Sequence, residues 1–169
     1  MKHAIFLVGT SHTLQLNDNQ NFSEDRLTFH QFLRNLCRDY FIQAIAEEMN
    51  TDALLEKGCD ESIPKMIADE LTLSHCYADP NISVRNRLMI LQENDVNAKG
   101  WLEAWTKQKI REQIQIEYVK RERYWIEQII KHNVWPLLFV CGANHIESFS
   151  LLVQSAGLDM KIISKDWPN

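Results

Sequence analysis

The chain has 169 residues, of which 45% are hydrophobic and 24% are charged, and its formal net charge is -5. This length and composition fit one globular domain with an ordinary core, so we expect a single α/β domain over residues 1–169. The acidic balance argues against a nucleic-acid partner, because proteins that bind nucleic acids present a dominant basic face to the phosphates.

The cysteines and the N-terminal segment indicate the compartment. The chain has four scattered cysteines and no C-x-x-C pair, a pattern of reduced thiols and not of a disulfide frame or zinc knuckle: Cys37, Cys59, Cys76 and Cys141. The apolar stretch near the N-terminus has only about six residues, which is too short for a signal peptide. No run of about 18 apolar residues occurs. We therefore expect a cytoplasmic protein with no membrane partner.

The first part of the chain predicts alternating strands and helices. Residues 4–8 form a continuous apolar run ended by Gly9, which suits a strand buried on both faces. The polar residues 15–22 predict a loop, after which Ser23 caps an amphipathic helix that reaches Tyr40. Residues 41–48, FIQAIAEE, fit either continued helix or a short strand, and the alternation of elements favours the strand. A loop is expected from there to Gly58.

The remaining elements continue the alternation. We expect helices over 62–71, 83–92, 101–132 and 148–156, the last closed by Gly157, with a loop over 94–100. Strands are expected over 73–77, 134–141 and 160–163. The pattern predicts a mostly parallel five-stranded sheet flanked by helices, with one long helix before the fourth strand.

Two short motifs of the form Gly-x-x-His follow predicted strands directly. They are GTSH at 9–12 and GANH at 142–145. Parallel strands end at one edge of a sheet, where open α/β sheets bind ligands, so His12 and His145 should both lie over that edge. Glycine lets the backbone turn sharply off a strand and approach a ligand closely. The motifs therefore predict further ligand-binding residues: Gly9, Thr10, Ser11, Gly142 and Asn144.

Carboxylates are expected at the same edge. Glu47 and Glu48 end the second predicted strand, and Asp79 follows the third. Two imidazoles with one carboxylate, such as His12, His145 and Glu47, could bind a divalent Mn, Zn or Fe ion. The same groups could instead carry out acid and base chemistry without a metal. Each histidine could also serve only to bond a loop carbonyl, since such short patterns are weak.

An arginine interrupts the apolar stripe of the long helix. Arg121 lies three residues after Tyr118 and four before Trp125. A buried arginine requires an anionic or carbonyl partner, so we predict that Arg121 belongs to the site. Pairing with Glu117 one turn earlier is the structural alternative. Arg85 could reach the same edge from the start of its helix as a ligand-binding residue, although most arginines so placed are solvated.

Together these motifs resemble a superfamily that contains TraB and PrgY pheromone-shutdown proteins, Tiki metalloproteases, erythromycin esterases and ChaN haem-binding proteins. GTSH and GANH stand where the family pattern has its histidines, and KRERYWIEQI at 120–129 resembles its arginine-containing helix. Glu47 or Glu48 matches its acidic residue. Lys120 and Glu122 depart from the family's usual Glu and Asn or Asp. The resemblance implies metal-assisted or histidine-based hydrolysis in some members and binding in others.

With these residues, the resemblance implies a cytoplasmic hydrolase with a small-molecule or peptide substrate. In it His12, His145 and Glu47 or Glu48 hold a metal or activate water, while Arg121 orients the acids or stabilises an oxyanion. The alternative is a non-catalytic α/β protein that holds a small anionic ligand at the same edge. A homo-oligomer packed through the tryptophan-rich segment 101–135 is a third interpretation.

Overall fold

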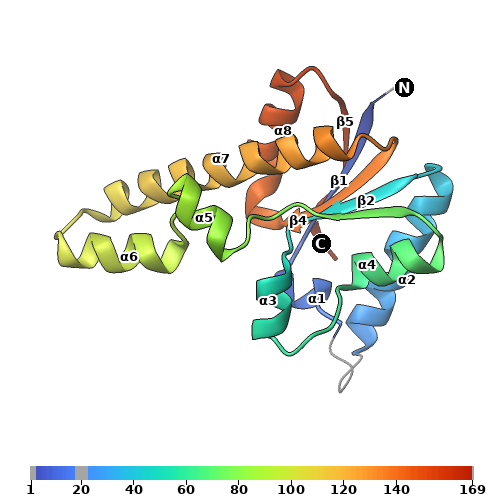
Figure 1. Ribbon diagram of the computed structural model, residues 1–169, viewed down its shortest axis with the longest axis horizontal. Coiled ribbons are helices and arrows are strands. Elements are labelled where there is room, and N and C mark those ends of the chain that lie inside the picture. Colours follow the sequence, from blue (N-terminus) through green and yellow to red (C-terminus); the bar gives the residue numbers. More distant parts are fainter. Residues whose placement is uncertain (1–2, 18–22, 169) are drawn as a thin grey trace.

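A sheet of five parallel strands forms the centre of the molecule (Figure 1). The computed structural model describes residues 3–17 and 23–168. The strands are β1 (Ala4–Thr10), β2 (Ala44–Glu47), β3 (Ser74–Tyr77), β4 (Leu137–Gly142) and β5 (Asp159–Trp167), in the order β3-β2-β4-β1-β5. The parallel α/β fold predicted from the sequence is confirmed.

Helices cover both faces of this sheet. One face is covered by α2 (Glu24–Asp39) and α4 (Ile63–Glu70), and the other by α7 (Lys107–His132) and α8 (Ile146–Ser155). Shorter helices lie in the connections: α1 (His12–Gln15), α3 (Thr51–Glu56), α5 (Ile82–Leu88), α6 (Glu93–Leu102) and the 3₁₀ turn η1 (Ala143–His145). The single long helix before the fourth strand is α7, as predicted.

The inner strands are apolar on both sides because each side is covered. In β1, Phe6 and Val8 pack with α2 and α4, whereas Ile5 and Leu7 pack with α7 and α8. Burying each such side chain contributes about 1.5–3 kcal/mol. Continuous apolar runs therefore mark these strands in the sequence, with no polar residue in alternate positions.

The strand order decides which residues meet at the ligand edge. β4 lies between β1 and β2, with Thr10 opposite Gly142 and Val140 opposite Glu47. The chain leaves these three neighbouring strands through the two Gly-x-x-His motifs and through Glu48. The topology thus brings together three segments that are far apart in the sequence.

The start or stop signals predicted for three helices are confirmed. The Ser23 side chain accepts a hydrogen bond from the Arg26 amide at the start of α2. Pro64 lies in the first turn of α4, where it removes no helical hydrogen bond. Gly157 follows α8 with φ +73°, the left-handed conformation expected of a C′ glycine.

The region between β3 and β4 differs from the prediction. The loop expected over 94–100 is wrong, because α6 occupies Glu93–Leu102 and begins with reciprocal capping between Gln92 and Asp95. The expected helix 101–132 starts late, at Lys107, where Thr106 caps it. Ala104, at φ +52°, turns the chain between the two helices. The helix expected over 83–92 ends earlier, at Leu88.

Two smaller helices were not predicted. α1 (His12–Gln15) ends at the first residue of the expected loop 15–22, and α3 fills part of the loop expected before Gly58. Asn50 caps α3 by accepting from the Ala53 amide. Residues 18–22 of the expected loop lie outside the described residues. The final strand is also longer than predicted and reaches Trp167.

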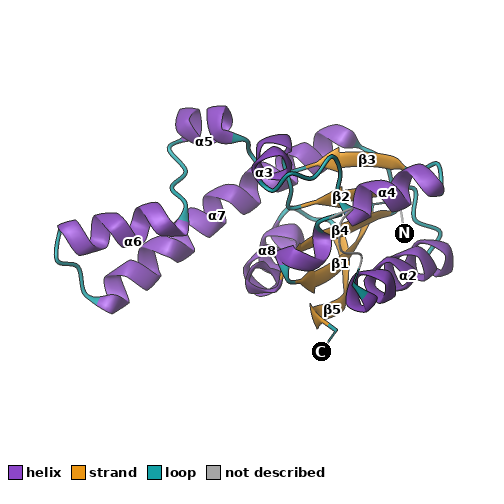
Figure 2. Cartoon of the chain, turned by 90° about the horizontal axis from the view of Figure 1, so that it is seen from below, coloured by secondary structure: helices purple, strands orange, loops and turns teal. Residues whose placement is uncertain are grey.

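α6 and the first half of α7 form a helical hairpin that projects away from the sheet (Figure 2). Gly100 permits their close approach, because a Cβ there would come within 2.6 Å of the Ile110 side chain. Within the described chain, no helix combines the length and apolarity needed to cross a membrane.

Candidate functional site

Glu48 is the buried carboxylate at the centre of the site. Its side chain is only 1% exposed, and it follows β2 at the ligand edge. Arg121 Nη2 donates to Glu48 Oε1 at 2.7 Å, and the Gly142 amide donates to Glu48 Oε2 at 2.8 Å. Both oxygens are therefore held by protein donors from α7 and β4.

Two histidines converge on one oxygen of this carboxylate. His12 Nε2 lies 3.7 Å and His145 Nε2 lies 3.5 Å from Glu48 Oε1. Since both distances end at the same atom, the two Nε2 atoms are separated by no more than their sum. The two motifs thus meet, as the parallel topology predicts. Their environments differ, because the His12 side chain is 58% exposed and that of His145 only 4%.

Glu122 holds the ring of His145 from behind. Its Oε1 lies 2.8 Å from His145 Nδ1 and also accepts a hydrogen bond from Ser148 Oγ at 2.6 Å. An ionised carboxylate only accepts, so the ring donates to Glu122 through Nδ1. Its other nitrogen, Nε2, faces Glu48. Tyr118 and Trp125 pack on the same ring, with centroids 4.1 and 4.8 Å away.

Glu122 was missed as a site residue in the sequence, although a signal was present. It lies four residues after Tyr118 and three before Trp125, in the buried stripe of α7. A carboxylate with no exposure at such a position requires a partner. His145 and Ser148 supply it, directly after the second motif.

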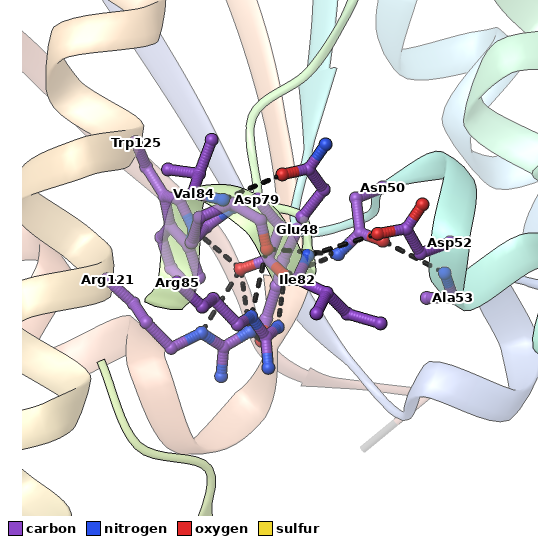
Figure 3. Close-up of polar contacts among 12 residues, drawn as sticks. Glu48, Asn50, Asp52, Ala53, Asp79, Ile82, Val84, Arg85, Arg121 and Trp125 are labelled. Carbon is purple, nitrogen blue, oxygen red and sulfur yellow. Dashed lines mark hydrogen bonds and ion pairs between the residues drawn. The ribbon is translucent and has the colours of Figure 1, made fainter. Parts of the chain in front are cut away.

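Asp79 organises the other side of the site (Figure 3). Its Oδ1 accepts from Arg121 Nε at 3.1 Å, from Arg121 Nη2 at 2.7 Å and from Trp125 Nε1 at 3.0 Å. Its Oδ2 accepts from Arg85 Nη2 at 2.5 Å and from Asn50 Nδ2 at 2.9 Å. Burial alone would raise the pKa of Asp79, but the charges of Arg121 and Arg85 outweigh it and hold that pKa below its usual value.

Arg121 bridges the two buried carboxylates. Burial opposes its charge, but Glu48 and Asp79 more than compensate and raise the pKa of the guanidinium. The structural alternative of a pair with Glu117 is wrong. Glu117 accepts instead from Lys120 at 2.9 Å and from Gln113 at 2.7 Å. Arg121 is therefore a fixed cation between the strand ends.

Glu47 lies apart from the histidines of the motifs. Its carboxylate accepts from Ser62 Oγ and lies 2.8 Å from His75 Nε2, on the sheet face covered by α4. Successive side chains of a strand point to opposite faces, so Glu47 cannot join Glu48 at the ligand edge. Of the two glutamates that the sequence left open, Glu48 lies with His12 and His145, and Glu47, which was predicted as a metal ligand, does not. Burial, followed by the nearby Glu47 charge, raises the pKa of Tyr77 to about 12.

Two adjoining cavities open beside these groups. One of about 500 Å³ lies between the strand ends, α3 and the projecting hairpin, and the other of about 410 Å³ lies over the two motifs. His12, Tyr118 and Arg121 line both. The first is also lined by Glu48, Asp79 and Arg85, and the second by Thr10, Ser11, Gly142, Asn144 and His145. The larger volume is in the range of small-molecule sites.

The motif glycines have different packing roles. A Cβ at Gly142 would lie 3.1 Å from His12 Nε2 and 3.3 Å from Glu48 Oε2, so this glycine makes room for the site. A Cβ at Gly9 would lie 2.1 Å from the Lys165 carbonyl oxygen. Gly9 therefore serves the packing of β1 on β5, away from the cavity. Thr10 is buried and donates to the Trp167 carbonyl at 3.3 Å.

The donor set fits a metal ion poorly. Glu48 Oε1, the atom shared by both histidines, already accepts from Arg121, whose permanent positive charge opposes a second cation there. Glu48 Oε2 is engaged by the Gly142 amide. Among the residues that the structure describes, no three His, Cys, Asp or Glu side chains form a group suited to a metal.

Comparisons with known proteins leave the family of this chain open. No protein-family model matches the sequence, and neither a search of curated proteins nor a search of solved structures finds a match.

Proposed function

We propose that the protein is a histidine-dependent hydrolase that activates water at the ligand edge of the sheet. One observation carries the proposal: two imidazole nitrogens from separate strand ends converge on one buried, arginine-bound carboxylate oxygen beside a cavity. His12 and His145 lie within reach of the same carboxylate, and Glu122 orients the ring of His145. This is the arrangement that acid and base catalysis requires.

His145 is the general base of this proposal. Glu122 keeps the proton on Nδ1, so Nε2 is free to take a proton from water as the water oxygen attacks the substrate carbonyl. The ring then becomes a cation, which the Glu122 carboxylate at Nδ1 stabilises. Burial of His145 keeps this contact strong, because little water screens it.

His12 and Arg121 complete the proposed mechanism. His12 is exposed at the cavity, where it can give a proton to the leaving group and regain one from solvent. Arg121 holds Glu48 and supplies positive charge near the oxyanion of the tetrahedral intermediate. Asn144 lines the smaller cavity and is a candidate second donor to that oxygen.

The test is a panel of chromogenic carboxylic esters and amides incubated with the wild type and with His12→Gln and His145→Gln. Loss of the base or acid is expected to lower kcat/KM by about 100-fold to 10,000-fold. His30→Gln is the matched control, because His30 pairs with Glu70 away from the site. Hydrolysis that survives unchanged in the double variant His12→Gln/His145→Gln would refute the proposal.

The role of a metal is tested on the same preparations. We expect wild-type protein purified without chelator to contain no stoichiometric divalent ion and to keep its activity in EDTA. Mn, Zn or Fe bound in the wild type but lost from the double variant would instead support the metal-assisted form of the reaction. Ligand-induced thermal stabilisation that requires Arg121, without turnover of any substrate, would favour the binding protein.

A further inference from the structure

The end of the projecting hairpin exposes large apolar side chains. We define the arm tip as residues 99–111, which include the end of α6, the turn and the start of α7. Within it Trp101 is 81% exposed and Leu102 is 75% exposed. Single exposed apolar residues are common, but an adjacent exposed Trp and Leu at a protruding end form a candidate contact site.

The packing of α6 explains why these side chains face outward. Val96 and Gly100 are the buried residues of the helix, and they lie one turn apart on one side. Trp101 and Leu102 follow at about 100° and 200° around the axis from Gly100, so they point away from α7. The hairpin interface therefore cannot bury them.

The charges of the arm tip differ in sign from those of the whole chain. The segment holds four cationic residues and one carboxylate, Glu103, whereas the chain has a net charge of -5: Lys99, Lys107, Lys109 and Arg111. The Nζ atoms of Lys99 and Lys109 lie 5.7 and 4.3 Å from the centroid of the Trp105 ring. Cations and exposed apolar side chains thus share one end of the molecule.

We propose that the arm tip docks on an anionic lipid surface, inserting Trp101 and Leu102 at the level of the head groups. The tip projects from the body in both views (Figures 1 and 2), a form suited to shallow insertion. Tryptophan favours the membrane interface, and the surrounding lysines and arginine complement anionic head groups. Such peripheral contact needs no membrane-spanning helix.

The observations favour a lipid surface over a second protein. The hairpin exposes Trp101 and Leu102 at its tip and Ile116 further along α7. Ile116 lies about 200° around α7 from Ile114, a residue that lines the cavity. The hairpin therefore lacks a continuous apolar face of the kind a stable helical partner would bury. The proposal is independent of the hydrolase site.

The experiment is co-sedimentation of the full chain with vesicles of phosphatidylcholine, with and without about 30% phosphatidylglycerol. We expect binding to the anionic vesicles that weakens as salt rises. Lys107→Gln and Arg111→Gln should each weaken it about fivefold. The double variant Trp101→Ser/Leu102→Ser should weaken it about tenfold or more. Because all four substituted side chains are exposed, the thermal unfolding midpoints of these variants should match that of the wild type.

The matched control is Leu151→Ser combined with Lys131→Gln, which removes an exposed leucine and a cation far from the tip along the chain. It should bind the anionic vesicles as the wild type does. The proposal would be overturned if the wild type bound anionic and neutral vesicles equally. Equal loss of vesicle binding in the control and in the tip variants would also overturn it. A concentration-dependent dimer that the Trp101→Ser/Leu102→Ser variant abolishes, with no vesicle binding, would assign the tip to protein contact instead.

Discussion

Replacing Asp79 by Asn should be among the most costly single changes in the site. The Asp79 side chain is only 4% exposed and accepts five hydrogen bonds, three of them from guanidinium groups. Asparagine removes the negative charge and turns an amide NH₂ toward groups that are themselves donors. Arg121 would keep Glu48, but Arg85 would keep only the Pro80 carbonyl.

Breaking a buried charge network in this way costs about 3–5 kcal/mol. We expect a loss of this size in the free energy of unfolding, measured by urea denaturation with far-UV circular dichroism and an unchanged m value. Asp69→Asn is the control, because Asp69 is 59% exposed and pairs with Lys65 on the surface. It should change stability by about 1 kcal/mol at most. A loss below about 1 kcal/mol for Asp79→Asn would show that this network does not hold the site together.

Three further predictions follow from single contacts. The pKa of Asp79 is lowered in the folded chain, so the stability that its charge contributes is present above the ordinary aspartate pKa of about 3.9. That contribution is lost as pH falls toward the folded pKa. The free energies of unfolding of wild type and Asp79→Asn should therefore converge as pH falls through this range. Glu122→Gln should move the His145 proton to Nε2, since the amide can donate to Nδ1, and lower kcat by about 100-fold or more; nitrogen NMR reports the tautomer, and an unchanged tautomer contradicts this role. Gly9→Ala should cost at least about 1–3 kcal/mol, because its Cβ would meet the Lys165 carbonyl at 2.1 Å, whereas the Gly58→Ala change, in open space at φ +66°, should cost only about 1 kcal/mol in the same melts.

The helical arm shows where local patterns mislead. The polar residues Asn94, Asp95 and Asn97 suggested a loop, yet they lie on the exposed side of α6, which is buried only through Val96 and Gly100. A helix that packs on one neighbour needs few apolar residues, so its periodic signal is weak. The Thr106 cap was the local signal that separates α6 from α7.

The site was also only partly predictable. Which of Glu47 and Glu48 faces the histidines depends on where β2 ends, and a shift of one residue exchanges the two faces of a strand. The roles of Asp79 and Glu122 depend on how α7 is rotated against the sheet. That rotation is set by the packing of Trp125 and Ile129 in the core.

Apolar runs, caps and glycines act over a few residues, so the buried strands, the main helices and the equivalent placement of the two Gly-x-x-His motifs could be predicted from local patterns. No local pattern predicts that β4 lies between β1 and β2, that His12 and His145 share the Glu48 oxygen, or that Arg121 joins Glu48 to Asp79. Through Glu48 the site brings together residues up to 133 positions apart in the sequence, from His12 to His145. Their geometry depends on strand order and helix rotation, which arise from packing of the whole core.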